Sequence, residues 1–158
     1  MKDLKHLYYF EKLLEDANND LVRQAKSEGR LALGYTCYHM PEVLLNLDGC
    51  FSVRLRAPRT GSMEIATYYM SNATCEYARA LLERRLEGGY KFLDAMAGVD
   101  VCECMNRGME NMELLGVSDP AKKGFFWCNL DSPCSDDEDC VAHLREQLSR
   151  KILKPLHE

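Results

Sequence analysis

The chain has 158 residues, a formal net charge of −5 and 46% hydrophobic residues, which is enough for one domain with a substantial core and too little for two ordinary domains. The acidic balance argues against nucleic-acid binding, because a face for phosphates requires clustered Lys and Arg. The first six residues are mostly polar and no apolar run approaches the roughly 20 residues that cross a bilayer, so we expect a soluble, cytoplasmic protein without a membrane partner.

The sequence begins with a long segment of helical character. Leucine and aromatic residues recur at helical spacing from Lys2 to Glu28, and Gly29 ends the helix. The polar residues 16–20 are a weak point in the middle of this helix. We therefore expect residues 1–30 to form one long N-terminal helix that packs on the domain formed by residues 31–158.

The rest of the chain alternates between strand-like and helical segments. Short apolar or alternating runs predict four strands, at 31–35, 51–55, 95–101 and 124–128. Helical spacing and terminus signals predict helices at 41–45, 64–70, 76–87, 105–116 and 141–153. This alternation is typical of an α/β protein, with a Rossmann-like or flavodoxin-like parallel sheet of about four strands and helices on both faces.

Five of the eight cysteines can be placed relative to the predicted sheet. Cys37 follows the first strand, Cys102 follows the third and Cys128 ends the fourth, so these three are expected at the carboxyl edge, where open α/β sheets bind ligands. Cys50 precedes the second strand and belongs to the opposite edge. Cys75 begins a predicted helix, where the positive end of the helix dipole favours a thiolate.

Cysteines in proteins commonly serve as disulfide partners, packing groups or zinc ligands. Disulfide scaffolds are usually small, secreted and poor in core, unlike this chain. Free cysteines are among the residues most often buried as inert packing groups, and this role stays open here. A zinc site is less favoured, because the sequence has no Cys-x-x-Cys pair and its four His keep no ligand spacing with the cysteines. The glycine motifs of standard nucleotide-binding loops are also absent from the sequence.

Three segments carry a family resemblance. They are residues 34–42, with the sequence Gly-Tyr-Thr-Cys-Tyr-His-Met-Pro-Glu, residues 75–82, with the sequence Cys-Glu-Tyr-Ala-Arg-Ala-Leu-Leu, and Cys102 with the helix that follows. This ordered series resembles the 2-hydroxyacyl-CoA dehydratase and benzoyl-CoA reductase family, D-component type, in which a Cys-containing turn leads into a Pro-Glu helix. The likeness covers residues 31–116 well and 125–156 more loosely, and corresponds to the N-terminal half of such a subunit.

The resemblance implies oxygen-sensitive iron–sulfur chemistry. Subunits of the family resemble two Rossmann-like halves with a 4Fe–4S cluster between them, held by two cysteines of the first half and one of the second. Cys75 and Cys102 fall where the two first-half ligands are expected, with Cys37 as a further candidate. The third ligand is then expected outside this chain, on a second half or a companion subunit.

The implied mechanism is a radical dehydration. An ATP-dependent activator protein injects one electron, a ketyl radical forms on a 2-hydroxyacyl-CoA, and the hydroxyl group leaves; relatives reduce aromatic acyl-CoA esters. Glu42 and His39 are candidate catalytic residues, because they leave the same turn as Cys37 and His titrates in the useful range. A first-turn Glu also stabilises a helix dipole, and a His in a turn is often simply solvated.

These observations lead to one main hypothesis and two alternatives. The main hypothesis is the N-terminal, cluster-binding half of a dehydratase-type or reductase-type subunit, a lyase component with little activity on its own. The first alternative is a non-catalytic α/β module that keeps cysteines for electron transfer, cluster storage or partner docking. The second is an ordinary α/β domain with buried thiols and an unknown ligand.

Overall fold

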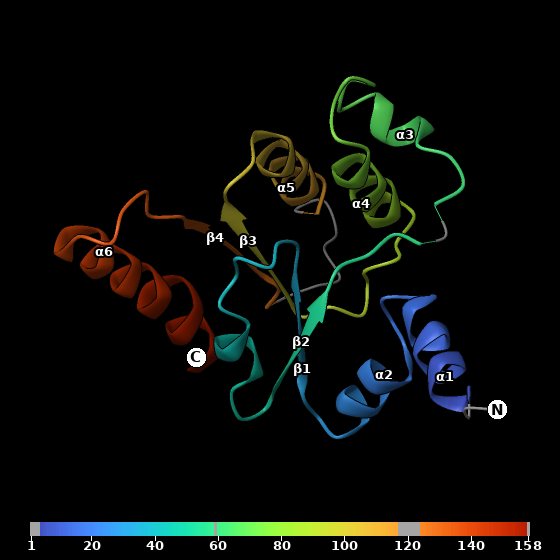
Figure 1. The fold of residues 1–158 in the computed structure, drawn as a ribbon, viewed down its shortest axis with the longest axis horizontal. Coiled ribbons are helices and arrows are strands. Elements are labelled where there is room, and N and C mark those ends of the chain that lie inside the picture. The colour runs from blue at the N-terminus through green and yellow to red at the C-terminus, as the bar shows by residue number, and fades with distance from the viewer. Residues whose placement is uncertain (1–3, 59, 117–123, 158) are drawn as a thin grey trace.

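A parallel sheet with the strand order β2-β1-β3-β4 forms the centre of the computed structural model, which describes residues 4–58, 60–116 and 124–157 (Figure 1). All three strand pairs are parallel, and the register pairs Leu31 with Cys50 and Ala97 with Cys128. The strands are β1 Leu31–Tyr35, β2 Cys50–Arg54, β3 Ala95–Asp100 and β4 Phe126–Asp131. The predicted α/β fold with a parallel sheet is confirmed.

Helices cover both faces of the sheet, as predicted (Figure 1). The helices beside one face are α2 Asp20–Ser27, α3 Glu64–Thr67, α4 Glu76–Leu86 and α5 Glu103–Gly116. The helical segments beside the other face are the 3-10 helix η1 Glu42–Asn46, α6 Glu138–Leu148, the π-helix η2 Ser149–Leu153 and α7 Lys154–His157. No helix within the described segments has both the length and the apolar character needed to cross a membrane.

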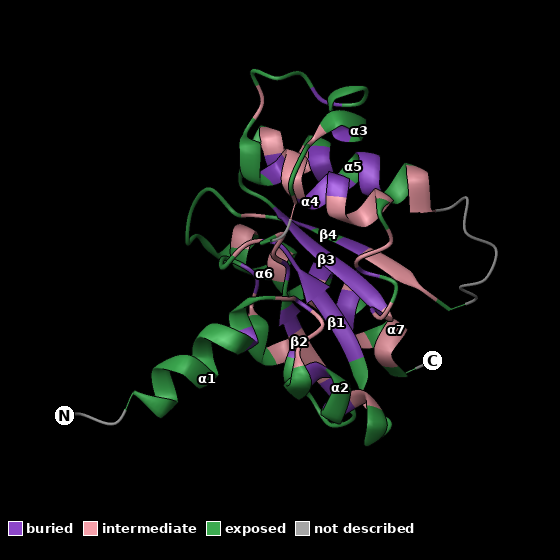
Figure 2. Cartoon of the chain, turned by 90° about the vertical axis from the view of Figure 1, so that its right-hand side faces the viewer, coloured by how far each residue is buried: buried purple, intermediate pink, exposed green. Residues whose placement is uncertain are grey.

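The sheet divides the core into two parts, because successive side chains of a strand point to opposite faces. On β1, Ala32 packs on the side of α4 and α5, whereas Leu33 packs on the side of η1 and η2. Met96 and Ala97 of β3 divide in the same way. Figure 2 shows β1 and β3 almost entirely buried, since each has a strand neighbour on both sides and helices above and below. The sheet thus gives the carboxyl edge a rigid base.

The N-terminal segment differs from the prediction, because the single long helix expected over 2–28 is two helices. Helix α1 spans Lys5–Leu14, and α2 begins after Asn19, whose side chain accepts the N–H groups of Leu21 and Val22 at 3.1 and 3.2 Å. An N-cap of this kind starts a new helix and so divides the segment at its polar middle. Helix α1 buries only Leu13 and extends away from the sheet (Figure 2), whereas α2 contacts β1 and β2.

Other elements also have boundaries that differ from those expected; the helix expected at 64–70, for example, ends at Thr67. Strand β4 extends to Asp131 instead of ending at Cys128. The last helix begins earlier than 141, because the carboxyl group of Asp137 accepts the N–H of Cys140 at 2.9 Å and caps α6. These shifts change the position of one predicted site residue, Cys128.

Candidate functional site

The candidate site lies at the carboxyl edge of the sheet, beside β1 and β3. From β1 the chain continues to β2 on one side, and from β3 it continues to β4 on the other side. Such a switch in strand order is where open α/β sheets bind ligands. Cys37 lies two residues beyond β1, Cys75 is the N-cap residue of α4, and Cys102 immediately precedes α5. The structure thus brings three predicted site cysteines to one edge.

Cys75 and Cys102 occupy equivalent positions at the starts of neighbouring helices. Both residues are exposed. The carbonyl of Cys75 accepts the N–H of Arg79 at 3.1 Å, and the carbonyl of Cys102 accepts the N–H groups of Met105 and Asn106 at 2.9 Å each. The helices that follow pack against each other. Because helix N-termini favour negative charge, both positions suit thiolate ligands.

Tyr77 links the start of α4 to the end of β1. Its hydroxyl group donates to the carbonyl oxygen of Leu55 at 2.9 Å and lies 3.3 Å from that of Thr36. Thr36 directly precedes Cys37, and Tyr77 follows Cys75 by two residues. No local pattern in the sequence singles out Tyr77, because its contacts join residues about 20 and 40 positions apart in the chain. Cys37 and Cys75 are therefore joined by a short covalent and hydrogen-bonded path.

Cys37 is half-buried and begins a tight turn. Its carbonyl accepts the N–H of Met40 at 3.0 Å, and the turn places Tyr38 and His39 at the surface. The rings of Tyr38 and His39 lie 4.7 Å apart between centroids. The predicted catalytic candidate His39 is thus exposed beside Cys37.

Glu42, the other catalytic candidate, is the first residue of η1. Its Oε1 atom accepts the hydroxyl group of Ser52 at 2.7 Å, which ties η1 to β2. Burial, together with a hydrogen bond to Glu42 and its negative charge, raises the pKa of Tyr35 to about 12. Glu42 therefore interacts with the last residue of β1, on the same edge as Cys37.

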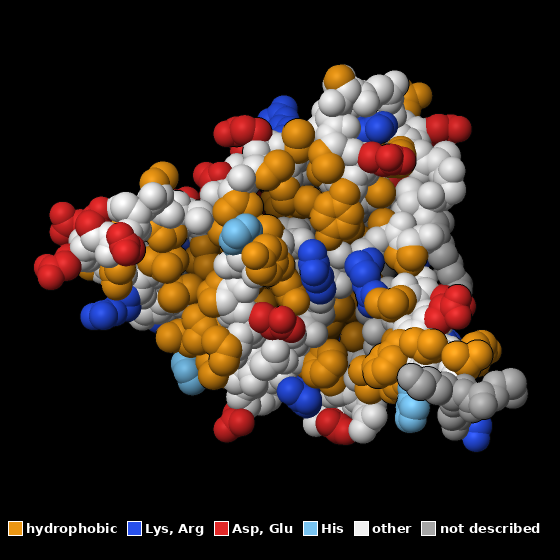
Figure 3. Space-filling model, in the orientation of Figure 1, with side chains coloured by type: hydrophobic (Ala, Val, Ile, Leu, Met, Phe, Trp, Pro, Cys, Tyr) orange, Lys and Arg blue, Asp and Glu red, His pale blue; other side chains and the backbone are white. Residues whose placement is uncertain are grey.

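Figure 3 shows this region as a face on which hydrophobic side chains gather between the helices, with Lys and Arg side chains among them. Exposed aromatic residues of this edge include Tyr38 on the turn after β1, Tyr68 and Tyr69 after α3, and Tyr77 on α4. Burial raises the pKa of Tyr77, and the positive charge of Arg54, the last residue of β2, partly opposes this rise. The edge therefore combines thiols, aromatic groups and a guanidinium group.

The family comparison agrees with this arrangement. Residues 37–157 match the family model described as 2-hydroxyglutaryl-CoA dehydratase, D-component. The chain belongs to the 2-hydroxyglutaryl-CoA dehydratase D-component family. The resemblance seen in the sequence is thus confirmed, and Cys37, Cys75 and Cys102 all lie within the matched region. The search of curated proteins gave no match.

The cysteines of this chain suit an iron–sulfur cluster chemically, because such clusters are held by thiolates. Within residues 4–58, 60–116 and 124–157, no three side chains of His, Cys, Asp or Glu are close enough to form a complete metal site. The thiols of Cys37, Cys75 and Cys102 lie at the same edge of the sheet without forming a complete metal site among the described residues.

Cys128 was expected at the same edge, and this prediction was wrong. It lies in the middle of β4, opposite Ala97, with only 3% of its surface exposed. Burial raises the pKa of the Cys128 thiol to about 11. Cys50 lies at the amino end of β2, as predicted, and burial raises the pKa of its thiol as well. Both are packing residues of this D-component domain, since each is part of the core.

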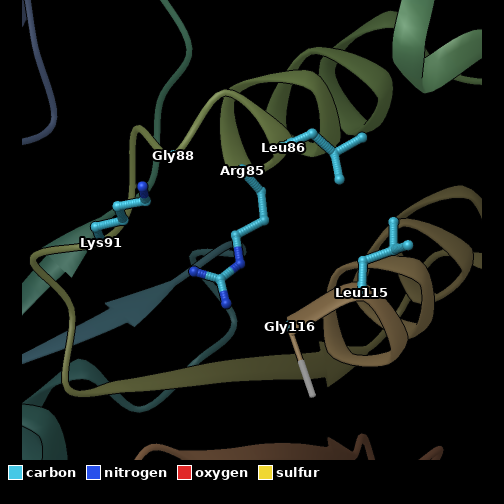
Figure 4. Close-up of a pocket in the computed structure, with 6 residues that line it drawn as sticks. All are labelled: Arg85, Leu86, Gly88, Lys91, Leu115 and Gly116. Carbon is cyan, nitrogen blue, oxygen red and sulfur yellow. The ribbon is translucent and has the colours of Figure 1, made fainter. Parts of the chain in front are cut away.

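A separate pocket of about 160 Å³ lies at the C-terminal ends of α4 and α5 (Figure 4). The side chains of Arg85 and Lys91 line one part of it, and those of Leu86 and Leu115 line the other. The guanidinium group of Arg85 also lies 5.8 Å from the centre of the Trp127 ring. Because the three cysteines lie near the opposite ends of these helices, this pocket is not part of the candidate site.

Proposed function

We propose that this chain is the cluster-binding half of a 2-hydroxyacyl-CoA dehydratase-type or acyl-CoA reductase-type component. The observation that carries the proposal is the location of Cys37, Cys75 and Cys102 at the carboxyl edge of the sheet, beside its switch point. Membership of the D-component family supports the same reaction class.

The proposed cofactor is a 4Fe–4S cluster, with Cys75, Cys102 and Cys37 as the candidate ligands. A ligand from a second half or a companion subunit completes the site, since the described residues of this chain contain no complete metal site. When bound, the cluster supplies one-electron transfer between an ATP-dependent activator protein and an acyl-CoA substrate. Thiolates are the usual ligands of such clusters, and the reduction potential of a cluster depends on the charge and solvent exposure around it.

The side chains around the cysteines have separate proposed roles. His39 exchanges a proton with the substrate, because it is exposed beside Cys37 and an imidazole ring carries both a donor and an acceptor nitrogen. Glu42, held by the hydroxyl group of Ser52, orients the turn and places a negative charge beside Tyr35. The exposed aromatic residues of this edge exclude water when the second half covers them.

The test of the cofactor is anaerobic reconstitution with iron and sulfide, with and without the adjoining half of the subunit. Iron and sulfide content, thiolate-to-iron absorbance and EPR spectra are compared for the wild type and for Cys37→Ser, Cys75→Ser and Cys102→Ser. Cys134→Ser is the matched control, because Cys134 is an exposed cysteine between β4 and α6. We expect cluster loss in the variants of true ligands and wild-type content in the control. Failure to assemble a cluster even with the adjoining half present would rule the proposal out.

The test of the activity uses the assembled complex with its activator, ATP and a series of 2-hydroxyacyl-CoA substrates. Formation of the unsaturated acyl-CoA supports a dehydratase, and reduction of an aromatic acyl-CoA supports a reductase. A stable cluster that is reduced by the activator without turning over any of these substrates would favour the electron-transfer alternative instead.

A further inference from the structure

The hydroxyl group of Tyr77 lies where β1 and β2 separate. The last backbone bond between these strands runs from the N–H of Leu55 to the carbonyl of Tyr35, at 2.8 Å. The next carbonyl groups, those of Leu55 and Thr36, both lie within hydrogen-bond distance of the Tyr77 hydroxyl, at 2.9 and 3.3 Å. The Tyr77 hydroxyl thus bridges the two chain segments just beyond their last backbone hydrogen bond and connects both segments to α4.

The first turn of α4 depends on this contact more than the rest of the helix does. Cys75, the N-cap residue, makes no side-chain capping bond, so the first turn lacks the usual restraint at a helix start. Of the first turn, only Ala78 is fully buried, whereas the body of α4 is held by the larger side chains of Leu81 and Leu82, both fully buried in the core shared with the sheet and α5. Loss of the Tyr77 hydroxyl is therefore expected to loosen the first turn while the helix stays in place.

We infer that Tyr77 is a positioning residue that fixes the distance between the thiols of Cys37 and Cys75. The importance of this distance for a cluster rests on the proposed function. Cys37 follows Thr36 directly, and Cys75 precedes Tyr77 by two residues. The path between them is closed by the single O–H of Tyr77, which is shared between the Leu55 carbonyl at 2.9 Å and the Thr36 carbonyl at 3.3 Å. A cluster ligated from both segments requires this distance to be set before iron binds. Tyr77 itself touches neither the iron nor the substrate in this proposal.

The test measures thiol proximity in the cluster-free, full-length chain. The parent protein carries Cys102→Ser, Cys104→Ala, Cys134→Ser and Cys140→Ser, which leaves Cys37, Cys75 and the two buried cysteines. Dibromobimane becomes strongly fluorescent when it joins two thiols, and the rate of this intramolecular step is measured, with peptide mapping of the product. Iodoacetamide rates for each thiol correct for changes in single-thiol reactivity.

Tyr77→Phe is compared with Tyr90→Phe as a matched control. The hydroxyl group of Tyr90 donates to the carbonyl of Arg56 at 2.9 Å, next to the Leu55 carbonyl used by Tyr77 and not to the Thr36 carbonyl beside Cys37. We expect Tyr77→Phe to slow the cross-linking of Cys37 to Cys75 by about fivefold, the factor for one net hydrogen bond, and Tyr90→Phe to leave it unchanged. Equal rates in the two variants, or no cross-link in the parent, would overturn the inference.

A pair of variants with equal side-chain volume guards against a folding defect. Tyr77→p-aminophenylalanine keeps an N–H donor at the same place and should restore the parent rate, whereas Tyr77→p-methylphenylalanine should not. Identical rates for this pair also overturn the inference. Cluster reconstitution of Tyr77→Phe and Tyr90→Phe in the protein that keeps all eight cysteines, with the adjoining half supplied, separates the two ideas. A slower cross-link without cluster assembly in any of these proteins removes only the proposed cofactor, and normal assembly with unchanged cross-linking removes only the role of Tyr77.

Discussion

The carboxyl group of Glu83 on α4 accepts the backbone N–H of Ala66 on α3 through Oε2 at 2.6 Å, in the interior of the protein. Only 2% of Glu83 is exposed, and its other oxygen lies 3.4 Å from the N–H of Ile65. Helix α3 is a single turn, which is too short to be stable alone. Glu83 therefore holds the segment between β2 and Cys75 against α4.

Replacement of Glu83 by Ala should destabilise the protein by about 2 kcal/mol, because two N–H groups of α3 lose their acceptor and one of them is buried. Urea unfolding measures the loss, and hydrogen exchange should show faster exchange at residues 64–67. The control is Glu87→Ala, since Glu87 is exposed and its contact with Arg84 is 3.6 Å long, so that its removal should cost well under about 1 kcal/mol. Equal losses in both variants would contradict this role of Glu83.

Gly34 in β1 should not tolerate a methyl group. A Cβ atom at this position would lie 2.6 Å from Cδ1 of Leu93 and 3.2 Å from Cδ2 of Leu55, both fully buried. Because the core is closely packed, we expect Gly34→Ala to cost about 1–3 kcal/mol of unfolding free energy. Gly61→Ala is the matched control, since nothing lies within 4 Å of its Cβ position. A neutral Gly34→Ala in thermal and urea unfolding would show that Leu93 moves away without cost.

The central strands could be predicted from the sequence because each is a continuous run of mostly apolar residues. The apolar run at 31–35 coincides with β1, and the predicted third strand coincides with β3 to within one residue. Buried strands of a parallel sheet are continuous apolar runs, so a local signal is sufficient for them. The order of strands and helices then placed Cys37 and Cys50 at opposite edges, as the register of β1 with β2 shows.

The features that were missed depend on contacts between distant residues. Strand β4 was predicted too short because Asn129 and Asp131 are polar, but the buried side chain of Gln147 accepts the N–H of Asp131 at 2.9 Å and donates to its carbonyl at 3.3 Å. This pairing from α6 extends the edge strand and puts Cys128 in its middle. The contacts of Tyr77 were missed for the same reason. The break at Asn19 was different, since a capping signal was present in the sequence.

Asp94 provides a test of the link between α2 and the sheet. Its Oδ2 atom accepts the N–H of Ala32 at 2.8 Å and also binds the ammonium group of Lys26 at 2.6 Å. The ion pair is about one-third exposed and contributes little, whereas the N–H belongs to Ala32, which is only 1% exposed, so that the loss of its acceptor costs more. We therefore expect Asp94→Ala to cost about 1–2 kcal/mol and Lys26→Ala about 0.5 kcal/mol. The unfolding free energies of both variants in urea decide this, and a larger loss for Lys26→Ala would contradict it.

The buried thiol of Cys128 should make the protein less stable at alkaline pH. Its pKa is raised by burial from the ordinary 9.0 to about 11 in the folded state. Below pH 9 the thiol is protonated in both states, so this group adds no pH dependence. As the pH rises from 9 to 11, the unfolded chain releases the proton first, and folding loses up to about 2 kcal/mol from this group.

The matched comparison is Cys128→Ala, which lacks the titrating thiol. Tyr35 also has a raised pKa and contributes an alkaline loss to both proteins, so the difference between their curves isolates Cys128. In urea unfolding at about pH 7 to 10, the variant should start less stable, because a buried sulfur is removed, and should approach the wild type as the pH rises. Iodoacetamide should react with Cys128 in the folded protein far more slowly than with the exposed Cys134. If the stability curves of wild type and variant run parallel, the thiol ionises equally easily in the folded and the unfolded state. Burial of Cys128 would then not disfavour its thiolate form.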